Sequence, residues 1–427
     1  MSSRKKAPRP AGPSVVVDLG SHSLKAGFGN VALGSGWAPD LVEPTATLPE
    51  EGRATQLGAN AVAAFDRRSA VVRPVRRGKV VDHAQLELLL NHLVANTLEA
   101  NAGRHSILFA DAPGHGAGSN KDREFFMTLA FEKWNMRACV FYPAPVLAAF
   151  SAGKTTATVV DCGHESSSVS VVYEGRMEQN KVLRVDHPSA SDKMLQLLMG
   201  NERGTLDDLG PAVEKIALDN CYVCANIARE RAKAKAGRTK KKYKLPDGQW
   251  ITISEERFAV PEDLMTAPFG NRWRKAGQGG LPGAVASVLQ GTFEEHGQTV
   301  YRDLAENLVA CGGRSDVEGF DERFDTELRV MLGVKKKKKY VEGDEDDPYV
   351  SELDASRAAE EQKENTSKMT EPFDFVPKSR SRKHPRRFAT WAGGALISDF
   401  RGLREMWTTK KQFEELGADL AVDGRRF

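Results

Sequence analysis

The fold of this chain is indicated by one stretch of sequence, VVVDLGSHSLKAGFG at residues 15–29. An apolar β-branched run ends at Asp18, and a turn containing Gly20 and Ser21 follows. A second strand-like run then carries Lys25. Backbone N–H groups in such a turn can point at an anion, and glycine allows the anion to approach closely. The pattern therefore predicts a hairpin that holds phosphate.

The pattern returns in altered form as TVVDCGHES at residues 158–166. Asp161 and Gly163 stand there in the places of Asp18 and Gly20. Two similar hairpins in one chain suggest two similar halves that hold one nucleotide between them. The first copy keeps the residues that such a hairpin needs, whereas the second does not.

The overall composition indicates a globular protein with more than one domain. A chain of 427 residues is too long for one simple core. Its hydrophobic content of 40% and charged content of 28% are typical of such proteins. The net charge of +3 is too small to attract nucleic acid or membranes strongly to the protein as a whole. No apolar stretch approaches the ~20 residues of a membrane span, so we expect no membrane association.

The cysteines and the N-terminus indicate an intracellular protein. Five scattered cysteines favour a reducing compartment over a disulfide framework. Cys221 and Cys224 form a CxxC pair inside an apolar, helix-like run at 217–228, and no second ligand pair lies at zinc spacing. We expect a buried helix face there. Residues 1–13 are basic and Pro-rich without an apolar core, so they predict a disordered tail and no signal peptide.

Blocks of charge mark segments outside the expected core. Residues 334–384 contain five consecutive lysines, an acidic run and a second basic run, and they predict a flexible charged insertion. Further basic runs at 4–6, 238–242 and 378–387 are typical of nuclear import signals or nucleic-acid contacts. We expect import and no direct binding of nucleic acid, because an acidic run adjoins the lysines and no aromatic residues are interleaved.

Several further motifs, taken in order with the two hairpins, resemble the actin family over residues 14–427. They are RPVRRGKVVD at 73–82, PVLAAFSAGKTTATVVDCG at 145–163, YKLPDGQWITISEERFAVPEDL at 243–264, CGG at 311–313 and RRFATWAGGALISDFRGLREMWTTKKQFEELG at 386–417. Hsp70 chaperones and sugar kinases share the hairpins but not the last run. Within the family, the first hairpin and the 145–163 motif look most like the nuclear actin-related protein four class.

The resemblance implies an α/β protein with the actin-like ATPase-domain fold. Two similar domains, each with a five-stranded sheet, would enclose a central nucleotide cleft. The first domain would comprise residues 14–151 and 388–427, with a small outer subdomain at about 39–73. The second would comprise residues 152–387, with an outer subdomain at about 188–296.

The resemblance also implies which residues would bind ATP and magnesium. On the first hairpin these are Asp18, Gly20, Ser21 and Lys25, with the Lys25 ammonium on the phosphates. On the second hairpin they are Asp161 and Gly163, with Asp161 orienting magnesium through water. Gly312 and Gly313 would form the turn that admits the base and phosphates, and Arg387 would lie near the family's adenine-facing lysine.

Two departures from the family pattern predict that this chain is not an enzyme. Actins orient the attacking water with a glutamine and a histidine, and this chain has Ala144 and Ser168 in those places. Phosphoryl transfer depends on positioning and electrostatics, so the loss of both groups should remove most of the rate. We expect negligible ATPase activity.

Other departures concern binding of the nucleotide itself. Glu165 replaces a glycine that meets phosphate, and it would bring bulk and a like charge against an anion. Ala217 and Leu218 replace a Lys-Glu pair that holds ribose and adenine, and Arg314 replaces a threonine. Two explanations fit the sequence. Either ATP is bound weakly as a structural ligand, or the cleft holds no nucleotide and is kept shut by salt bridges or packing.

These features favour an interaction subunit. A nuclear actin-related protein would bind a long helix of a chromatin-remodelling or histone-acetyltransferase subunit, beside actin or another family member, and would contact histones. The partner groove would include Trp391, Phe400, Met406 and Trp407, which supply apolar anchors. The alternative is a cytoskeletal or dynein-motor-associated actin-related protein with structural ATP. Filament formation is not expected, because residues 39–72 lack an obvious protruding loop.

Overall fold

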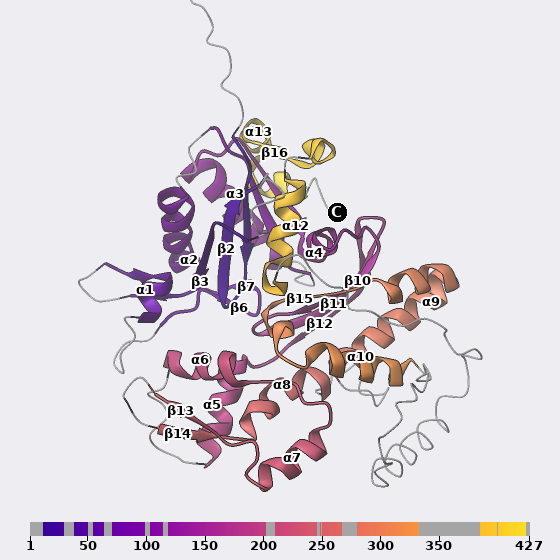
Figure 1. The fold of residues 1–427 in the computed structure, drawn as a ribbon. Helices are drawn as coiled ribbons and strands as arrows, with labels where there is room; N and C mark the ends of the chain where they lie inside the picture. Colours follow the sequence, from indigo (N-terminus) through magenta and orange to yellow (C-terminus); the bar gives the residue numbers. More distant parts are fainter. Residues whose placement is uncertain are drawn as a thin grey trace, which may run out of the picture.

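The computed structural model describes most of the chain (Figure 1). The described residues are 12–29, 38–49, 54–63, 71–98, 103–113, 118–201, 210–245, 248, 250–266, 280–332, 385–398 and 400–423. Residues 1–11 of the expected tail at 1–13 and the expected insertion at 334–384 lie outside them, whereas the Gly12 N–H donates to the Arg104 carbonyl at 2.9 Å. No helix in the described part of the chain is long and apolar enough to cross a membrane.

A sheet ordered β16-β9-β8-β1-β2-β3 forms the first half of the molecule. Its strands are β1 (Val15–Leu19), β2 (Ser23–Phe28), β3 (Leu41–Pro44), β8 (Ile107–Asp111), β9 (Ala138–Pro143) and β16 (Thr408–Thr409). β1 pairs antiparallel with β2 and parallel with β8. Because side chains alternate along a strand, Val15 and Val17 enter one core while Val16 enters another. The β-branched run thus fills both faces of the sheet.

Helices cover the outer face of this first sheet. They are α2 (His83–Leu90) with a π-helical continuation (Asn91–Thr97), α3 (Gly118–Thr128) with a π-helical continuation (Leu129–Lys133), and α13 (Lys410–Asp423). The side chain of Asp82 accepts a hydrogen bond from the Gln85 N–H at 3.0 Å and caps α2. The leucines at 86, 89, 90 and 93, which follow Asp82 at helical spacing, predict this helix from the sequence, and it is confirmed.

The second half has a sheet ordered β12-β11-β10-β15 in the described residues. Its strands are β10 (Ala157–Cys162), β11 (Ser166–Tyr173), β12 (Arg176–Asp186) and β15 (Leu308–Cys311). The helix α9 (Gly280–Glu306), kinked at Gly297, covers one face together with α10 (Phe320–Met331). The sheets are thus not the equal five-stranded pair that was expected, because the C-terminal segment returns to pair with β9 and extends the first one.

The two sheets share one helical layer. It consists of α4 (Ala144–Ser151) and α12 (Ala389–Ile397), which lie between the sheets (Figure 1). One core cluster joins Val16 of β1 and Val159 of β10 through Trp391 of α12. At the helix contact, a Cβ atom added to Gly393 would lie 1.8 Å from the Leu147 carbonyl oxygen. The two halves are therefore built on a common middle layer.

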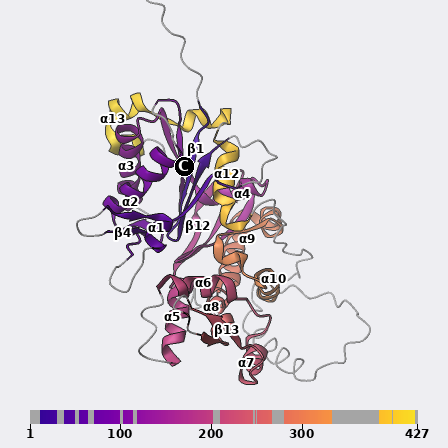
Figure 2. The ribbon, with the colours of Figure 1, turned by 60° about the vertical axis from the view of Figure 1, so that its left-hand side comes forward.

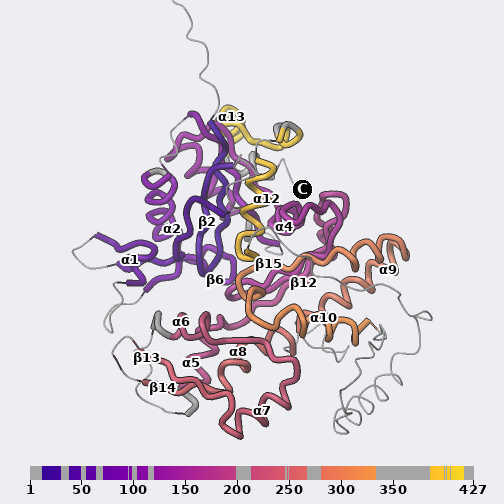
Figure 3. The backbone as a smooth tube through the Cα atoms, in the orientation of Figure 1, coloured from indigo at the N-terminus to yellow at the C-terminus, as the bar shows by residue number. Residues whose placement is uncertain are grey.

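Each half also carries a smaller lobe (Figure 2). The first lobe contains β4 (Thr47–Leu48), β5 (Gln56–Leu57), α1 (Gly58–Ala63) and the hairpin of β6 (Val75–Arg76) and β7 (Lys79–Val80). The second contains α5 (Ala190–Asn201), α6 (Gly210–Asn220), α7 (Ile227–Lys235), β13 (Lys241–Lys244), β14 (Trp250–Ile253) and α8 (Glu256–Thr266). Short 3-10 turns occupy Gly313–Asp316, Arg386–Phe388 and Arg401–Met406. Asp-Gly between two strand-like arms at 243–253 predicts a hairpin, which is confirmed as β13 and β14 (Figure 3).

Two predicted helices are interrupted. The CxxC run at 217–228 is not one helix, because α6 ends before Cys221 and α7 begins after Cys224. Backbone groups between them bond elsewhere, as when the Tyr222 N–H donates to the Arg257 carbonyl at 3.0 Å. The aromatic-rich run at 403–416 likewise predicts a helix, but α13 begins only at Lys410, after β16 has paired with β9. Long-range pairing overrides helix propensity in both places.

Candidate functional site at the junction of the two halves

The first predicted phosphate hairpin is formed by β1 and β2. Asp18 lies opposite Lys25 across the strands, and the Lys25 ammonium is 3.2 Å from an Asp18 carboxylate oxygen. The Gly20 N–H donates to the Ser23 carbonyl at 3.1 Å and closes the turn. A Cβ atom at Gly20 would lie 3.0 Å from that same oxygen, so the turn favours glycine.

The second hairpin, formed by β10 and β11, repeats this geometry. Asp161 lies opposite Ser168, and the Gly163 N–H donates to the Ser166 carbonyl at 2.9 Å. A Cβ atom at Gly163 would lie 2.7 Å from that oxygen. The two glycine turns are therefore equivalent in backbone structure, although their side chains differ.

The carboxylates of the two hairpins lie near each other. Burial raises the pKa of the Asp161 carboxyl to about 6, and the charge of Asp18 acts in the same direction. Gly312 has φ +83°, and a Cβ atom there would lie 2.5 Å from Asp161 Oδ1. Gly313 has open space, since the nearest atom to its Cβ position is Arg387 Cβ at 4.0 Å. The structure thus brings Asp18, Asp161 and Gly312 together.

Glu165, in the turn of the second hairpin, reaches across to the first half. Only 5% of its surface is exposed, and one carboxylate oxygen lies 2.6 Å from Arg76 Nε. The other oxygen accepts a hydrogen bond from the Arg77 backbone N–H at 2.8 Å. Arg76 and Arg77 belong to the β6–β7 hairpin, so the contact joins the two halves directly. The anion between the halves at this point is a side chain of the protein.

Glu214 of α6 makes a second bridge between the halves. It is paired with His22 in the first hairpin turn and with Arg73, whose guanidinium nitrogen lies 3.1 Å away. Burial works to raise the pKa of Glu214, but the hydrogen bond and charge of His22, together with Arg73, lower it to about 2. Glu214 is therefore ionised at neutral pH. We use the term cross-junction bridges for the contacts of Glu165 and Glu214.

Sequence reasoning allowed for salt bridges that keep the cleft shut, but it did not identify the residues of the cross-junction bridges. It treated Glu165 only as an obstacle to phosphate and did not consider Glu214 or Arg73. A signal was present in RPVRRGKVVD, because three arginines in ten residues need nearby anions. The motif does not indicate which carboxylates these anions are, because they come from the other half of the chain.

The resemblance implies ATP with magnesium at this junction. Asp18 and Asp161 offer two carboxylates in one place, which suits a magnesium ion held through water. The phosphate-binding groups are already engaged, because Ser21 Oγ accepts from the Gly78 N–H at 3.1 Å and Lys25 is paired with Asp18. The Glu165 carboxylate adds a negative charge, which has the same sign as the charge of a triphosphate. The residues present therefore fit a triphosphate poorly, and the described residues contain no cluster of three or more metal-ligating side chains.

The places expected to hold the base and ribose offer few polar groups. Ala217 is 5% exposed within the core of the second lobe, and Leu218 projects into solvent. Arg314 is buried, which lowers the pKa of its guanidinium, and it donates to His187 Nδ1 at 2.9 Å. The guanidinium of Arg387 lies 4.9 Å from the ring centre of Phe388. Arg314 and Arg387 are thus each engaged with a neighbouring side chain of the protein.

Asp161→Asn is expected to stabilise the protein at neutral pH. The folded-state pKa of Asp161, about 6, lies above the ordinary value of 3.8, so its contribution to stability falls as the pH rises from about 4 to 6. Asparagine keeps the shape and removes the buried charge. At pH 7.5 the free energy of unfolding in urea should rise by about 2 kcal/mol. At pH 4 the free energies of unfolding of the two proteins should differ little. If the free energies of unfolding ran parallel over the whole pH range, the raised pKa of Asp161 would be contradicted.

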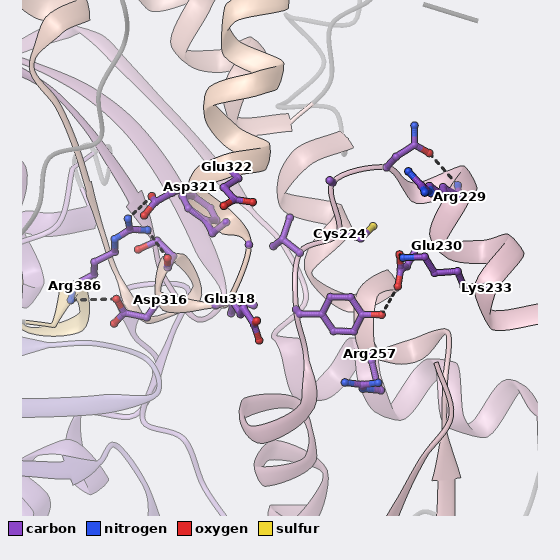
Figure 4. A pocket seen from close by; sticks show the side chains of 18 residues that line it. Cys224, Arg229, Glu230, Lys233, Arg257, Asp316, Glu318, Asp321, Glu322 and Arg386 are labelled. Carbon is purple, nitrogen blue, oxygen red and sulfur yellow. Dashed lines mark hydrogen bonds and ion pairs between the residues drawn. The ribbon is translucent and has the colours of Figure 1, made fainter. Parts of the chain in front are cut away.

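A pocket of about 940 Å³ lies beside the junction, in the second half (Figure 4). Its walls carry opposite charges. One wall has Asp316, Glu318 and Asp321 near the start of α10, and the facing wall has Arg229 and Lys233 from α7. Among its lining residues, Arg386 is held by Asp321 and by the Ser315 carbonyl. This pocket includes none of the hairpin residues.

The expected partner groove is only partly at the surface. Trp391 is 1% exposed and Trp407 is 9% exposed, and both belong to the core cluster of the middle layer. Burial in that cluster leaves little of either indole ring to contact a partner in this conformation. Met406 packs against the same cluster, whereas Phe400 is 69% exposed. Leu396, which sequence reasoning did not single out, is 38% exposed on α12.

Comparison with known proteins identifies the family. The model of the family described as Actin matches residues 10–200 and 211–427. Actin-like protein 9 of Rattus norvegicus is 25% identical over 420 residues, covering 96% of this chain and 88% of the relative. Actin-like protein 7B of Homo sapiens is 25% identical over 410 residues, covering 95% of this chain and 86% of the relative. The likeness to the actin-related protein four class stays a prediction, and the chain belongs to the actin family.

Proposed function

We propose that this chain is a non-catalytic interaction subunit of the actin-related type. The observation that supports this most is the Glu165 bridge, in which a carboxylate from one hairpin turn binds Arg76 and the Arg77 N–H of the other half. The protein thereby supplies its own anion between the two halves. We infer that the halves are held together without a nucleotide, so the molecule serves as a rigid scaffold.

The residues at the water-orienting positions also support a non-catalytic role. Ser168 is 3% exposed and lies across the strands from Asp161. Ala144 begins α4 and carries only a methyl group. Ala144 has no group that could orient a water, and the Ser168 hydroxyl is shorter than a histidine side chain and is not a base at neutral pH. We therefore propose that hydrolysis of ATP is negligible.

The purified chain should show neither tight ATP binding nor turnover. Equilibrium dialysis with labelled ATP and magnesium should give no saturable binding at micromolar concentrations, and phosphate release should equal that of the Asp161→Ala control. In Glu165→Gly the carboxylate is removed, and ATP retention should increase. Turnover by the natural chain that Asp161→Ala abolishes would overturn the proposal.

We further propose that the partner is a helix of a larger nuclear complex of the chromatin-remodelling or histone-acetyltransferase kind. The exposed side chains of Phe400 and Leu396 support an apolar contact of the helix-in-groove type. The basic runs of the sequence support nuclear import. A cytoskeletal or dynein-associated complex is the second candidate, favoured by membership of the actin family.

Localisation and purification of the tagged full chain distinguish these candidates. We expect nuclear signal and co-purification of an ATPase or acetyltransferase subunit, and Phe400→Ala should weaken that association about tenfold or more. Leu416→Ala is the matched control, because Leu416 is also exposed but lies on α13. A chain excluded from the nucleus, or one that purifies with motor subunits, would favour the cytoskeletal role instead.

A further inference from the structure

A dense concentration of positive charge lies on the second lobe, in α7 and the β13–β14 hairpin. Residues 229–244 contain nine arginines and lysines and one carboxylate, Glu230, in a chain whose net charge is only +3. The cations are Arg229, Arg231, Lys233, Lys235, Arg238, Lys240, Lys241, Lys242 and Lys244. Both elements lie at the lower end of the molecule in Figures 1 and 2, far from the shared middle layer. We call this region the basic lobe surface.

Most of these cations form no ion pair with the described carboxylates, although Arg229 and Lys233 face the acidic wall of the pocket described above. In the described residues, Arg231 pairs with Glu255 at 3.0 Å and Lys233 with Glu230 at 2.8 Å. The other seven make no ion pair with a described carboxylate. The helix α7 has no buried residue, so its side chains contribute little to the core. Repulsion among clustered like charges disfavours the folded lobe, and a polyanionic ligand would offset that repulsion.

The hairpin register places an indole ring among these cations. Lys244 lies opposite Trp250, and Lys242 lies opposite Thr252, on the outward face. Ile253 is fully buried, so the hairpin face that carries its side chain points inward. Trp250 is 64% exposed although tryptophan is the largest apolar side chain in the lobe. Lysines two residues apart on a strand are spaced about 6.6 Å along it, so the ribbon presents a row of cations beside an exposed ring.

We propose that the basic lobe surface binds single-stranded nucleic acid, with the lysines on the phosphates and Trp250 stacked on a base. Cations along an extended element neutralise successive phosphates. An exposed indole stacks on a base only where bases are unpaired, which favours a single strand over a duplex. An acidic peptide would use the cations but would leave the ring without a role.

An anionic membrane is the other polyanionic ligand that could contact both the lysines and an exposed tryptophan. Interfacial membrane elements present an apolar face with several large side chains. On α7 and the hairpin, Trp250 is the exposed large apolar residue in the described part of the chain. The surface therefore fits bases and phosphates better than lipid. The sequence alone did not indicate this, because Trp250 becomes a neighbour of the lysines only through the hairpin.

Fluorescence anisotropy of a labelled 20-nucleotide oligo(dT), titrated with the full chain over a series of salt concentrations, tests the proposal. We expect micromolar or tighter binding that weakens steeply with salt. Trp250→Ala should weaken binding about tenfold with the salt dependence unchanged. The double variant Lys242→Gln and Lys244→Gln should lower the slope of log affinity against log salt by about 1.4.

The double variant Lys410→Gln and Lys411→Gln is the matched control, because it removes two cations from α13 at the other end of the molecule. It should leave binding unchanged, although it removes the hydrogen bond from Lys410 to Asn135 at 2.6 Å, and the Trp250 and Lys242–Lys244 variants should keep the natural thermal midpoint. Equal losses in the control would show a diffuse charge effect and overturn the site. Binding to phosphatidylserine vesicles or to polyglutamate without binding to the oligonucleotide, or equal affinity for duplex DNA, would overturn the proposed ligand.

Discussion

Glu165→Ala is expected to lower the free energy of unfolding by about 3 kcal/mol, measured in urea at pH 7.5. The carboxylate is 5% exposed and makes two contacts across the junction, so its removal leaves the Arg77 N–H without its partner. The ion pair with Arg76 contributes less than a fully buried one, because half of the Arg76 side chain is exposed. Glu165→Gln should lower the free energy of unfolding by about 1 kcal/mol, since an amide oxygen can still accept a hydrogen bond from the Arg77 N–H.

The same variant should also loosen the junction. With the Glu165 contacts removed, the junction would keep the Glu214 bridge and the hydrogen bond that Arg184 of β12 donates to the Arg77 carbonyl at 2.5 Å. Small-angle X-ray scattering should then give a larger radius of gyration for Glu165→Ala than for the natural chain. Glu415→Ala is the control, because that carboxylate is 59% exposed and pairs with a lysine that is 83% exposed. Equal stability of all three proteins would contradict a structural role for the bridge.

Gly393→Ala is expected to have a still larger effect on stability, about 4 kcal/mol or failure to fold. A methyl group there would lie 1.8 Å from the Leu147 carbonyl oxygen and 2.4 Å from its carbon. Backbone of α4 cannot withdraw, since both helices are clamped between the two sheets. Circular dichroism should show an early thermal transition or loss of the folded signal.

Gly313→Ala provides the matched comparison. The nearest atom to its Cβ position is 4.0 Å away, and the residue is in a 3-10 turn that alanine can adopt. Its unfolding free energy should change by no more than about 0.5 kcal/mol. If both alanine variants behaved alike, the close approach of α4 and α12 would not limit the sequence at Gly393.

The two hairpins could be predicted from sequence because their signals are local. A β-branched run, an aspartate and a glycine within six residues specify strand, turn and strand, and both turns form as expected. The Glu165 bridge could not be predicted in the same way. Its partner Arg77 lies 88 positions earlier in the chain, and nothing local indicates that they meet. Long-range ionic contacts depend on how the two halves are placed.

The apolar residues near the C-terminus show a second limit. Trp391, Phe400 and Trp407 lie in one aromatic-rich run, and their chemistry alone does not separate core from surface. The run ATWAGGALI is apolar on every side, which is typical of a helix buried between two layers. That signal could have assigned Trp391 to the core. Phe400 follows the end of the helix, where the apolar pattern stops, and it remains exposed.

The shared middle layer has a consequence for how the protein is made. The helix α12 and the strand β16 come from the last forty residues of the chain, yet β16 pairs with β9 and α12 covers β1. A ribosome makes these residues long after the strands of the first half have emerged. The first half therefore cannot complete its core until α12 and β16 have been synthesised. Until then its nascent strands lack their covering helix and their edge partner, a condition that favours aggregation.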